Sequence, residues 1–205
     1  MTHSMFADLP VKPDPRTGEP RPPEAPLALG KMGPAPTKNL DKAGQTPDER
    51  GPALDVFIQD KRTVLLGSLI VMGVIIIGAS LQRGSFEWMS DPVMLGIVGL
   101  AGLIMLVSGW NVHLTAGADW LRVNRKWVDT YRITKIHLYG IVFGWTLVLH
   151  DADGRKVRVY IGSLEANREL WALVYNGLAH SVRAGATLNA LAGNMLKLRR
   201  FANSG

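Results

Sequence analysis

The stretch from Ala118 to Gly140 reads ADWLRVNRKWVDTYRITKIHLYG and combines five lysine and arginine side chains with regularly spaced apolar ones. At its start, Leu121 and Val123 alternate with Arg122 and Asn124. A period of two places successive side chains on opposite faces of a β-strand, whereas a helical face repeats every three to four residues. The stretch therefore predicts the first strands of a folded sheet, and not a free basic arm.

A second stretch, Trp145 to Ile161, predicts a β-hairpin and reads WTLVLHDADGRKVRVYI. Its two alternating runs are joined across Asp153-Gly154, a dipeptide typical of tight turns because glycine accepts a positive φ without steric cost. Just before the hairpin, Ile136 and Leu138 resume the earlier alternation after a phase shift, which predicts a bulge or bend. The hairpin pairing places these apolar residues on one face: Leu147, Leu149, Val157, Val159 and Ile161.

An amphipathic helix is predicted to follow the hairpin, from Asn167 to Gly185. Asparagine is a favourable N-cap, and glycine is the residue that most often follows a helix. One face carries small or apolar residues at helical spacing: Leu170, Leu173, Val174, Gly177, Leu178, Ser181 and Val182. Glycine weakens a helix interior, so Gly177 predicts a close approach between the helix and the strands.

Several strands followed by one closing helix resemble the bacterial pleckstrin-homology-like (PH-like) membrane proteins. The segments DWLRVNRKWVDTYRITKI, DADGR and LEANRELWALVYNGLAHSVRAGATLN resemble, more closely, a group of actinobacterial two-pass membrane proteins of unknown function with a C-terminal PH-like cytoplasmic domain. This resemblance covers residues 118–189 and implies no catalytic residues. A full pleckstrin-homology fold has seven strands before its helix, whereas residues 119–163 have room for four or five, so a truncated sheet with an open edge is expected.

Two uncharged apolar runs, Val64 to Leu81 and Val93 to Leu114, precede this domain. A helix of 18 residues at about 1.5 Å per residue is about as long as the hydrocarbon core of a bilayer is thick. The sequence therefore predicts a transmembrane hairpin over residues 60–115. The expected fold class is a membrane α-helical hairpin joined to a small α+β domain over residues 118–185, with an antiparallel sheet and one C-terminal helix.

Cations flank the outer ends of the two predicted spans. Arg50, Lys61 and Arg62 precede the first, and the opening stretch follows the second, while the connection carries one arginine beside two acids. Positively charged flanks remain on the cytoplasmic side, so both termini are expected in the cytoplasm of a multi-pass plasma-membrane protein. Aromatic residues are expected at the membrane interface at Phe86, Trp88 and Trp110.

Four glycines of the second span fall roughly along one side of a helix: Gly96, Gly99, Gly102 and Gly109. Small residues let another helix approach closely. They are candidate helix-packing residues, either for the first span of the same chain or for a partner subunit. Neither span carries a central charge, which disfavours a transporter.

The terminal segments differ from the centre in composition. Eleven of the twelve prolines precede Asp55, and residues 1–55 contain few aromatic or β-branched side chains, so this Pro-rich cytoplasmic tail is expected to be disordered. Its PRPPEAP segment favours polyproline II geometry and could dock in an aromatic groove of a partner. Residues 186–205 form a basic, weakly amphipathic tail, expected either on the membrane surface or frayed.

No signature of catalysis or metal binding is present. The chain has no cysteine, and it lacks the nucleophile-elbow, phosphate-loop and dinucleotide fingerprints. His137, His150, Asp151 and Asp153 have no recognised ligand spacing, and turn chemistry accounts for the aspartates. The protein is expected not to be an enzyme and to need no cofactor or metal.

The chain carries a net charge of +6, and its excess of lysine and arginine lies after residue 114. The sequence therefore predicts a membrane-anchored adaptor or scaffold whose PH-like domain binds a protein partner or anionic lipid headgroups. The candidate binding residues are Arg122, Arg125, Lys126, Arg132 and Lys135, and Arg155, Lys156 and Arg158 extend this cationic set. An ordinary solvated strand face explains the same charges.

Two other functions remain open. One is an accessory or assembly subunit of a larger respiratory, secretion or DNA-transfer complex. The other, membrane-tethered nucleic-acid binding, is the least favoured. The expected partners are membrane lipids, together with a second copy of the chain or another membrane protein.

Overall fold

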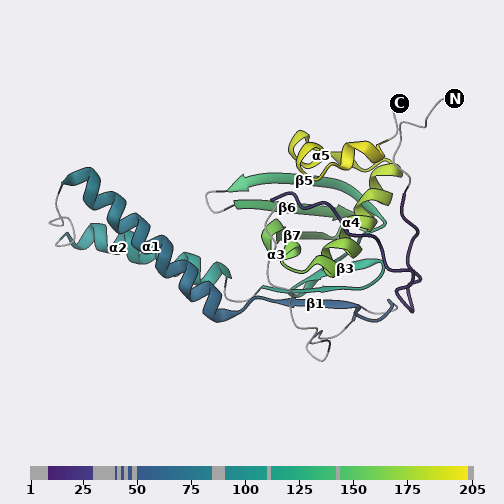
Figure 1. Cartoon of the computed structure of the whole chain (residues 1–205), viewed down its shortest axis with the longest axis horizontal. Coiled ribbons are helices and arrows are strands. Elements are labelled where there is room, and N and C mark those ends of the chain that lie inside the picture. Colours follow the sequence, from purple (N-terminus) through teal and green to yellow (C-terminus); the bar gives the residue numbers. More distant parts are fainter. Residues whose placement is uncertain are drawn as a thin grey trace. The chain divides into compact units, whose positions relative to one another are not determined.

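The computed structural model describes residues 9–29, 40, 43, 46–47, 50–84, 91–109, 112–141 and 144–202 (Figure 1). The chain divides into two compact units. Residues 58–112 form one unit, which we call the helix pair, and residues 1–57 and 113–205 form the other, which we call the α+β domain.

The helix pair consists of α1 (Lys61–Arg83) and α2 (Pro92–Gly109). Among the described residues, one helix is long and apolar enough to cross a membrane, over Val64–Gln82, with a mean hydropathy of 2.6. The apolar part of α2, Pro92–Ile104, is shorter. The prediction of two apolar helices is confirmed. The aromatic residues expected at a membrane interface lie outside the described residues: Phe86, Trp88 and Trp110.

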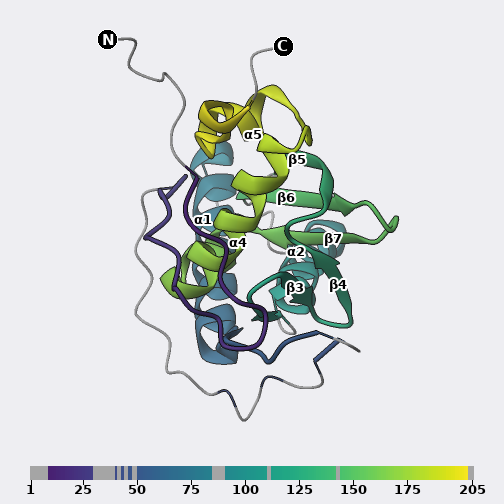
Figure 2. The same cartoon turned by 90° about the vertical axis from the view of Figure 1, so that its right-hand side faces the viewer.

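Two four-stranded sheets form the framework of the α+β domain (Figure 2). The first, sheet A, has the order β1 (Asp55–Ile58), β2 (His113–Ala116), β3 (Trp120–Val123) and β4 (Lys126–Asp129). The second, sheet B, has the order β7 (Lys156–Tyr160), β6 (Gly144–Asp151), β5 (Ile133–Ile141) and β8 (Thr187–Leu188). Strand β8 runs parallel to β5, whereas β5, β6 and β7 are mutually antiparallel.

The strand register of sheet B agrees with the predicted pattern. Leu147 pairs with Val159 and Leu149 with Val157, as the predicted hairpin requires. Gly154 has a φ of 78° in the turn. A register shift between Ile133 and Lys135 confirms the bulge inferred from the change of phase. These pairings bury the apolar side chains of β5, β6 and β7 on the inner face of the sheet.

Among the described residues, seven strands precede the long helix α4 (Arg168–Arg183), so the predicted truncation of the sheet is wrong. Five of these strands, β3 to β7, lie within residues 119–163, as the predicted room for four or five strands allows, and β2 precedes that range. The seventh, β1, comes from before the helix pair and lies beside β2, where the Leu54 N–H donates to the Ala116 carbonyl oxygen at 2.8 Å. The helix pair is thus inserted between the first two strands of a sheet.

Helix α4 packs against β2 and β5 and follows the short helix α3 (Ile161–Glu165). The predicted cap is confirmed, because the Asn167 side-chain oxygen accepts the Leu170 N–H at 3.1 Å. The predicted close approach at Gly177 is also confirmed. A Cβ atom placed there would lie 2.5 Å from the Thr130 Cβ, a distance that real Cβ atoms do not reach.

The last residues form part of the α+β domain, where the sequence predicted a tail on the membrane surface or a frayed end. After β8, the chain forms α5 (Ala190–Met195) and a 3-10 turn, η3 (Leu198–Phe201). Leu198 and Phe201 are buried, and the Tyr175 hydroxyl donates to the Leu196 carbonyl oxygen at 2.9 Å. Leu198 and Phe201 therefore add to the core, although the apolar residues of this segment are too few to form a continuous apolar face on a helix.

Residues 9–29 also depart from the expectation of a disordered tail. This N-terminal segment, drawn in purple in Figures 1 and 2, runs along α4 in both views. The Trp171 indole N–H donates to the Pro26 carbonyl oxygen at 3.0 Å, and Glu24 pairs with Arg168 at 3.0 Å. Disorder is therefore not what the structure shows for this segment. The composition of the segment predicted disorder because the segment has few apolar side chains of its own. The apolar surface at this contact belongs to α4.

Candidate anion-binding face

The outer face of sheet B carries a cluster of cations and imidazoles on three adjacent strands. In one cross-strand row, Lys135 pairs with His150, which pairs with Lys156. In the next row, His137 and Arg158 flank Val148. We call this cluster, Lys135, His137, His150, Lys156 and Arg158, the histidine face.

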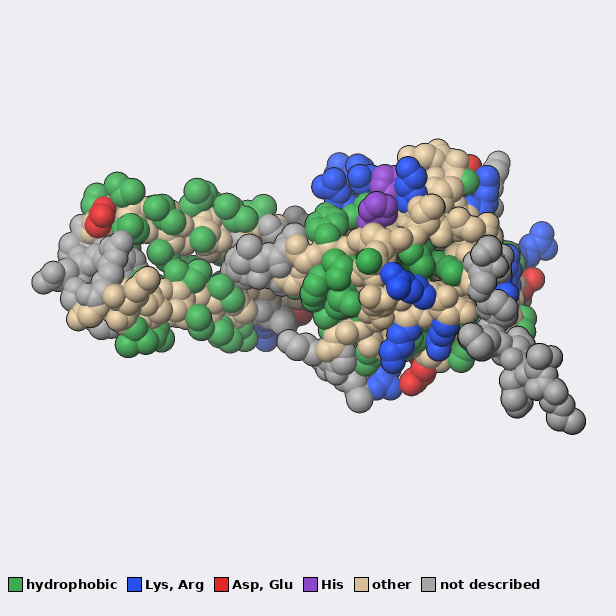
Figure 3. Space-filling view, turned by 90° about the horizontal axis from the view of Figure 1, so that it is seen from above, with side chains coloured by type: hydrophobic (Ala, Val, Ile, Leu, Met, Phe, Trp, Pro, Cys, Tyr) green, Lys and Arg blue, Asp and Glu red, His purple; other side chains and the backbone are tan. Residues whose placement is uncertain are grey.

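Strand alternation explains why these side chains gather. Each of the five belongs to the outward half of an alternating strand, whose inward half supplies apolar residues to the core. Directly opposed residues on one face of a sheet lie about 5 Å apart at their Cβ atoms, so the five head groups share one surface. In Figure 3, histidine side chains (purple) lie beside lysine and arginine side chains (blue).

The positive charge of the histidine face is not neutralised by any acid of the described residues. Within the described part of the chain, no carboxylate forms an ion pair with Lys135, Lys156 or Arg158. The acids at the end of the hairpin are engaged by Arg155, which donates to Asp151 at 2.9 Å and also pairs with Asp153. The histidine face can therefore attract an anion without first breaking an ion pair.

The cations also affect the protonation of the cluster. Partial removal from water, followed by the positive charges of Lys156, His137, Lys135 and Arg158, lowers the pKa of His150 below its ordinary value of 6.5. A bound phosphate would counter that repulsion and favour the protonated ring. The arrangement can thus bind an anion and couple the binding to proton uptake.

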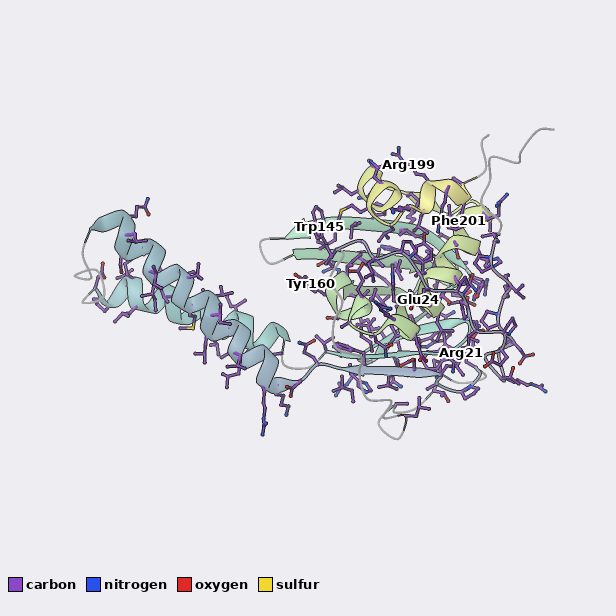
Figure 4. All side chains as sticks on the ribbon, in the orientation of Figure 1. Arg21, Glu24, Trp145, Tyr160, Arg199 and Phe201 are labelled. Atoms are coloured by element: carbon purple, nitrogen blue, oxygen red, sulfur yellow. The ribbon has the colours of Figure 1, made fainter. Side chains whose placement is uncertain are left out.

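An aromatic row continues the same face toward the other end of sheet B, where β5 ends and β6 begins. There Tyr139 pairs with Thr146, which pairs with Tyr160. Trp145, labelled like Tyr160 at this end of sheet B in Figure 4, lies against the backbone of Gly140. Because it alternates with Thr146 along β6, its side chain belongs to the opposite face of the sheet. Tyrosine favours the boundary between water and apolar surroundings, so the cationic groups adjoin the two tyrosines on one face of the sheet.

The five predicted binding residues do not form one site. Only Lys135 belongs to the histidine face. Arg125 is exposed in the turn between β3 and β4, and Lys126 is exposed as the first residue of β4. Arg122, in β3, donates through Nε to the Asn124 carbonyl oxygen of the turn at 2.9 Å. Arg132 pairs with Asp153 at 3.2 Å. Charge alone does not distinguish a turn from a strand face.

The sequence held a signal for the residues that were missed. His137, His150, Lys156 and Arg158 all occupy outward positions of the predicted alternation, and Lys156 and Arg158 belonged to the wider cationic set. The pairing of β5 with β6 was the information needed to join them. Among the described residues, no group of three or more histidine, aspartate or glutamate side chains is placed to hold a metal ion.

The glycines of α2 differ in their surroundings. A Cβ atom at Gly102 would lie 2.4 Å from the Met72 sulfur, so Gly102 accommodates α1. At Gly96 and Gly99 a Cβ atom would meet nothing within 4 Å among the described residues. Gly109 ends α2, and its surroundings lie outside the described part of the chain.

We compared the chain with models of protein families, with curated proteins and with solved structures. None of these comparisons found a match. The functional inference therefore rests on the chain's own residues.

Proposed function

We propose that this protein is a non-enzymatic, membrane-anchored adaptor whose α+β domain binds anionic lipid headgroups through the histidine face. The observation that carries the proposal is the cluster itself. Three lysine and arginine side chains without a carboxylate partner among the described residues surround two imidazoles, beside an aromatic row. A surface of anionic headgroups supplies many phosphates at once, which matches a flat, extended cationic face.

The helix pair supports the anchoring part of the proposal. Apolar side chains along α1 have no cover from the described chain, as at Leu66, Ile70 and Val74, and only 11% of its apolar window is buried. Lipid would cover such a surface more favourably than water. The proposed arrangement is a two-pass protein of the plasma membrane, with both termini and the α+β domain on the cytoplasmic side, where the flanking cations favour them.

The strand count supports the PH-like part of the proposal. Among the described residues, seven strands in two sheets precede one long helix, which is the number that a full pleckstrin-homology fold has. The helix pair is inserted between β1 and β2. The resemblance drawn on residues 118–189 does not include this insertion. Membership of the actinobacterial two-pass group is part of the same proposal.

Charge reversal within the histidine face tests the lipid-binding function. Each lysine or arginine near an anionic membrane contributes about 1 kcal/mol, so K156E/R158E is expected to weaken binding by at least about 30-fold. The full chain in neutral nanodiscs would be immobilised, and its binding to phosphatidylcholine vesicles with and without phosphatidylglycerol measured by biolayer interferometry.

The matched control for that experiment is R125E/K126E. It changes the net charge by the same amount at the turn between β3 and β4. We expect this control to retain most of the binding. Equal losses of vesicle binding in the two variants would contradict the proposed function. So would wild-type protein that binds equally well to vesicles with and without phosphatidylglycerol.

The affinity for anionic vesicles is expected to rise as the pH falls from about 7.5 to about 5.5. The lowered pKa of His150 means that the free ring gains its proton at a lower pH than usual, and a bound phosphate raises that pKa. Binding therefore takes up protons. The gain in affinity levels off once the pH falls below the pKa that His150 has in the unbound protein. In the same binding assay, H137Q/H150Q should flatten the pH profile, whereas H113Q should leave it unchanged. A wild-type profile without slope would contradict the involvement of the imidazoles.

The exposed glycines of α2 favour a second function, that of a subunit in a larger membrane complex. The chain has no native cysteine, so a single introduced thiol reports contacts without background. Under mild oxidation in native membranes, we expect G99C to give a crosslinked species and G102C, which faces Met72, to give none.

The mass of the crosslinked species distinguishes the partners. A dimer of the chain would indicate a second copy, and a heavier heterologous species would indicate another membrane protein. Absence of a G99C dimer would count against contact with a second copy of the chain, because oxidation joins two thiols and each copy supplies one. Nucleic-acid binding by the same cationic face is the remaining candidate, and duplex DNA that competes with anionic vesicles would favour it.

A further inference from the structure

The outward side of α4 is covered by the chain's own N-terminal segment, residues 9–29. On a surface helix one face normally meets water. Here every residue from Leu170 to Ala179 is buried among the described residues, although only part of that run faces the sheets. The N-terminal segment supplies part of the additional cover, as its path along α4 in Figures 1 and 2 shows, and η3 packs on the same helix through Phe201 beside Tyr175.

The contacts at one end of this interface involve the main chain of the segment. The Trp171 indole N–H donates to the Pro26 carbonyl oxygen at 3.0 Å. The Glu165 carboxylate accepts the N–H of Ala28 and, at 3.2 Å, the N–H of Leu29. A tryptophan and a carboxylate thereby hold the backbone of residues 26–29 by one acceptor and two donors.

The other end is held in the same way. The Asn176 amide donates to the Val11 carbonyl oxygen at 3.1 Å, and the His180 Nε2 lies 2.8 Å from the Pro10 carbonyl oxygen. A carbonyl only accepts, so the imidazole donates here. Burial, with a smaller effect of Lys12, lowers the pKa of His180, and the neutral ring keeps this donor.

The side chains of the segment add charge complementarity. Lys12 lies over the ring of Tyr131, with its Nζ 4.8 Å from the ring centroid. Farther along, Glu24 pairs with Arg168. Between these two contacts the interface is incompletely filled, and a cavity of about 200 Å³ remains. Glu24 and Phe201, both labelled in Figure 4, are among its lining residues.

We propose that this surface of α4 is a binding site for proline-rich peptides. Residues 9–29 fill it from within the chain as two arms joined by a turn, in which the Gly18 N–H donates to the Asp14 carbonyl oxygen at 2.7 Å. A proline-rich segment of a partner protein can occupy their place. Proline-rich peptides have a preformed extended backbone with outward carbonyls, and aromatic grooves with an indole donor recognise them. The ligand chemistry is read from the occupant: a cation near one end, prolines in the middle, and an acid that meets Arg168. The inference is independent of the proposed lipid binding, which uses the cationic outer face of sheet B and not α4.

The tethered segment must limit access to the site. A short linker holds a ligand at millimolar effective concentration, so a free peptide competes poorly with it. A partner would therefore bind well only when it presents a better-matched or multivalent proline-rich segment. The N-terminal segment acts in this way as a built-in competitor.

Cleavage of the tether tests the proposal. A protease recognition sequence would be inserted between residues 30 and 39 of the full chain in nanodiscs. A fluorescent synthetic peptide of residues 9–29 would then be titrated, with anisotropy as the readout. Cleaved and diluted protein is expected to bind the peptide at least about tenfold more tightly than uncleaved protein. Failure of the cleaved, folded protein to bind would overturn the inference.

Two tryptophan variants provide a matched comparison. W171F keeps an aromatic ring and removes the indole donor, and loss of one hydrogen bond of about 1 kcal/mol should weaken peptide binding about fivefold. W145F makes the same change on the hairpin of sheet B and should have no effect. Equal effects of the two variants would contradict a site on α4.

Hydrogen exchange on the uncleaved chain gives an independent measurement. If the segment can leave the site, the amides of Ala28 and Leu29 should exchange faster than the amides in the middle of α4, because the segment opens without global unfolding. Exchange at the same rate as α4, or loss of the folded circular-dichroism signal after cleavage, would show that the segment is an integral part of the fold and would overturn the proposal.

Discussion

Replacement of Arg50 by alanine is expected to lower the free energy of unfolding of the α+β domain by about 3 kcal/mol or more. The guanidinium donates to Asp129 at 2.8 Å and also pairs with Asp119. The side chains of these aspartates are 5% and 19% exposed. Without the arginine, two carboxylates would remain close together and largely removed from water, which is costly.

The protonation of Arg50 is consistent with this role. Burial alone would lower its pKa, but the hydrogen bonds that the guanidinium donates to the two carboxylates outweigh burial, so the pKa is raised. The guanidinium also lies over the Trp127 ring, at 5.4 Å from the centroid. Arg50 precedes β1, so it links the chain before the helix pair to the strands that follow.

Urea unfolding of the full chain in detergent, followed by tryptophan fluorescence, would measure the effect. R50K keeps the positive charge but cannot donate to both aspartates as the planar guanidinium does. We therefore expect R50K to lower the free energy of unfolding by roughly half as much as R50A. R16A removes an exposed arginine and should change stability by no more than about 0.5 kcal/mol. An R50A variant as stable as R16A would show that Asp119 and Asp129 do not depend on this partner.

The second large effect is expected at Gly177, where alanine should destabilise the domain by about 2 kcal/mol. The added Cβ would lie 2.5 Å from the Thr130 Cβ and 2.9 Å from the Thr130 carbonyl oxygen. Thr130 cannot easily yield, because its carbonyl oxygen accepts the Ser181 hydroxyl at 2.9 Å and the same hydroxyl accepts the Ile133 N–H. Helix α4 would have to move away from the strands.

Whether G177A raises or lowers the stability of the domain distinguishes the two explanations, helix propensity and steric contact. Alanine in an open helix interior is more favourable than glycine by about 1 kcal/mol, so helix propensity alone predicts a gain. Thermal unfolding monitored by circular dichroism would compare G177A with E169A on the exposed side of the same helix. A G177A protein that is more stable than wild type would refute the close contact.

Local sequence patterns predicted the parts of the fold that depend on neighbouring residues. The β6–β7 register follows from alternation, and the Asn167 cap and the Gly177 contact follow from residue preferences within one helix. These features involve residues close in sequence or single steric rules. They could therefore be read without knowing the rest of the fold.

Long-range partners could not be read in the same way. Strand β1 lies beside β2 across the whole helix pair, and no pattern in Asp55–Ile58 identifies that neighbour. The N-terminal segment is ordered by aromatic side chains of α4 such as Trp171, far away in the sequence. Its own composition favours disorder because it brings little apolar surface to the contact.

The candidate binding face was predicted only in part for a related reason. Charge density pointed to Arg125 in a turn and to Lys126 at the start of β4. The histidine face instead depends on the pairing of His150 with Lys135 on one side and with Lys156 on the other. Each member looks like an ordinary solvated residue when its strand is considered alone. Only the sheet brings them together.

The position of β1 has a consequence for synthesis of the protein. A ribosome releases β1 first, and 54 residues separate it from β2. At about 5–20 residues per second, β1 must wait several seconds for its hydrogen-bonding neighbour. During that time its unpaired edge needs protection from other chains. The α+β domain can thus be completed only after the helix pair has been translated, so an error in the helices would also stop the sheet from closing.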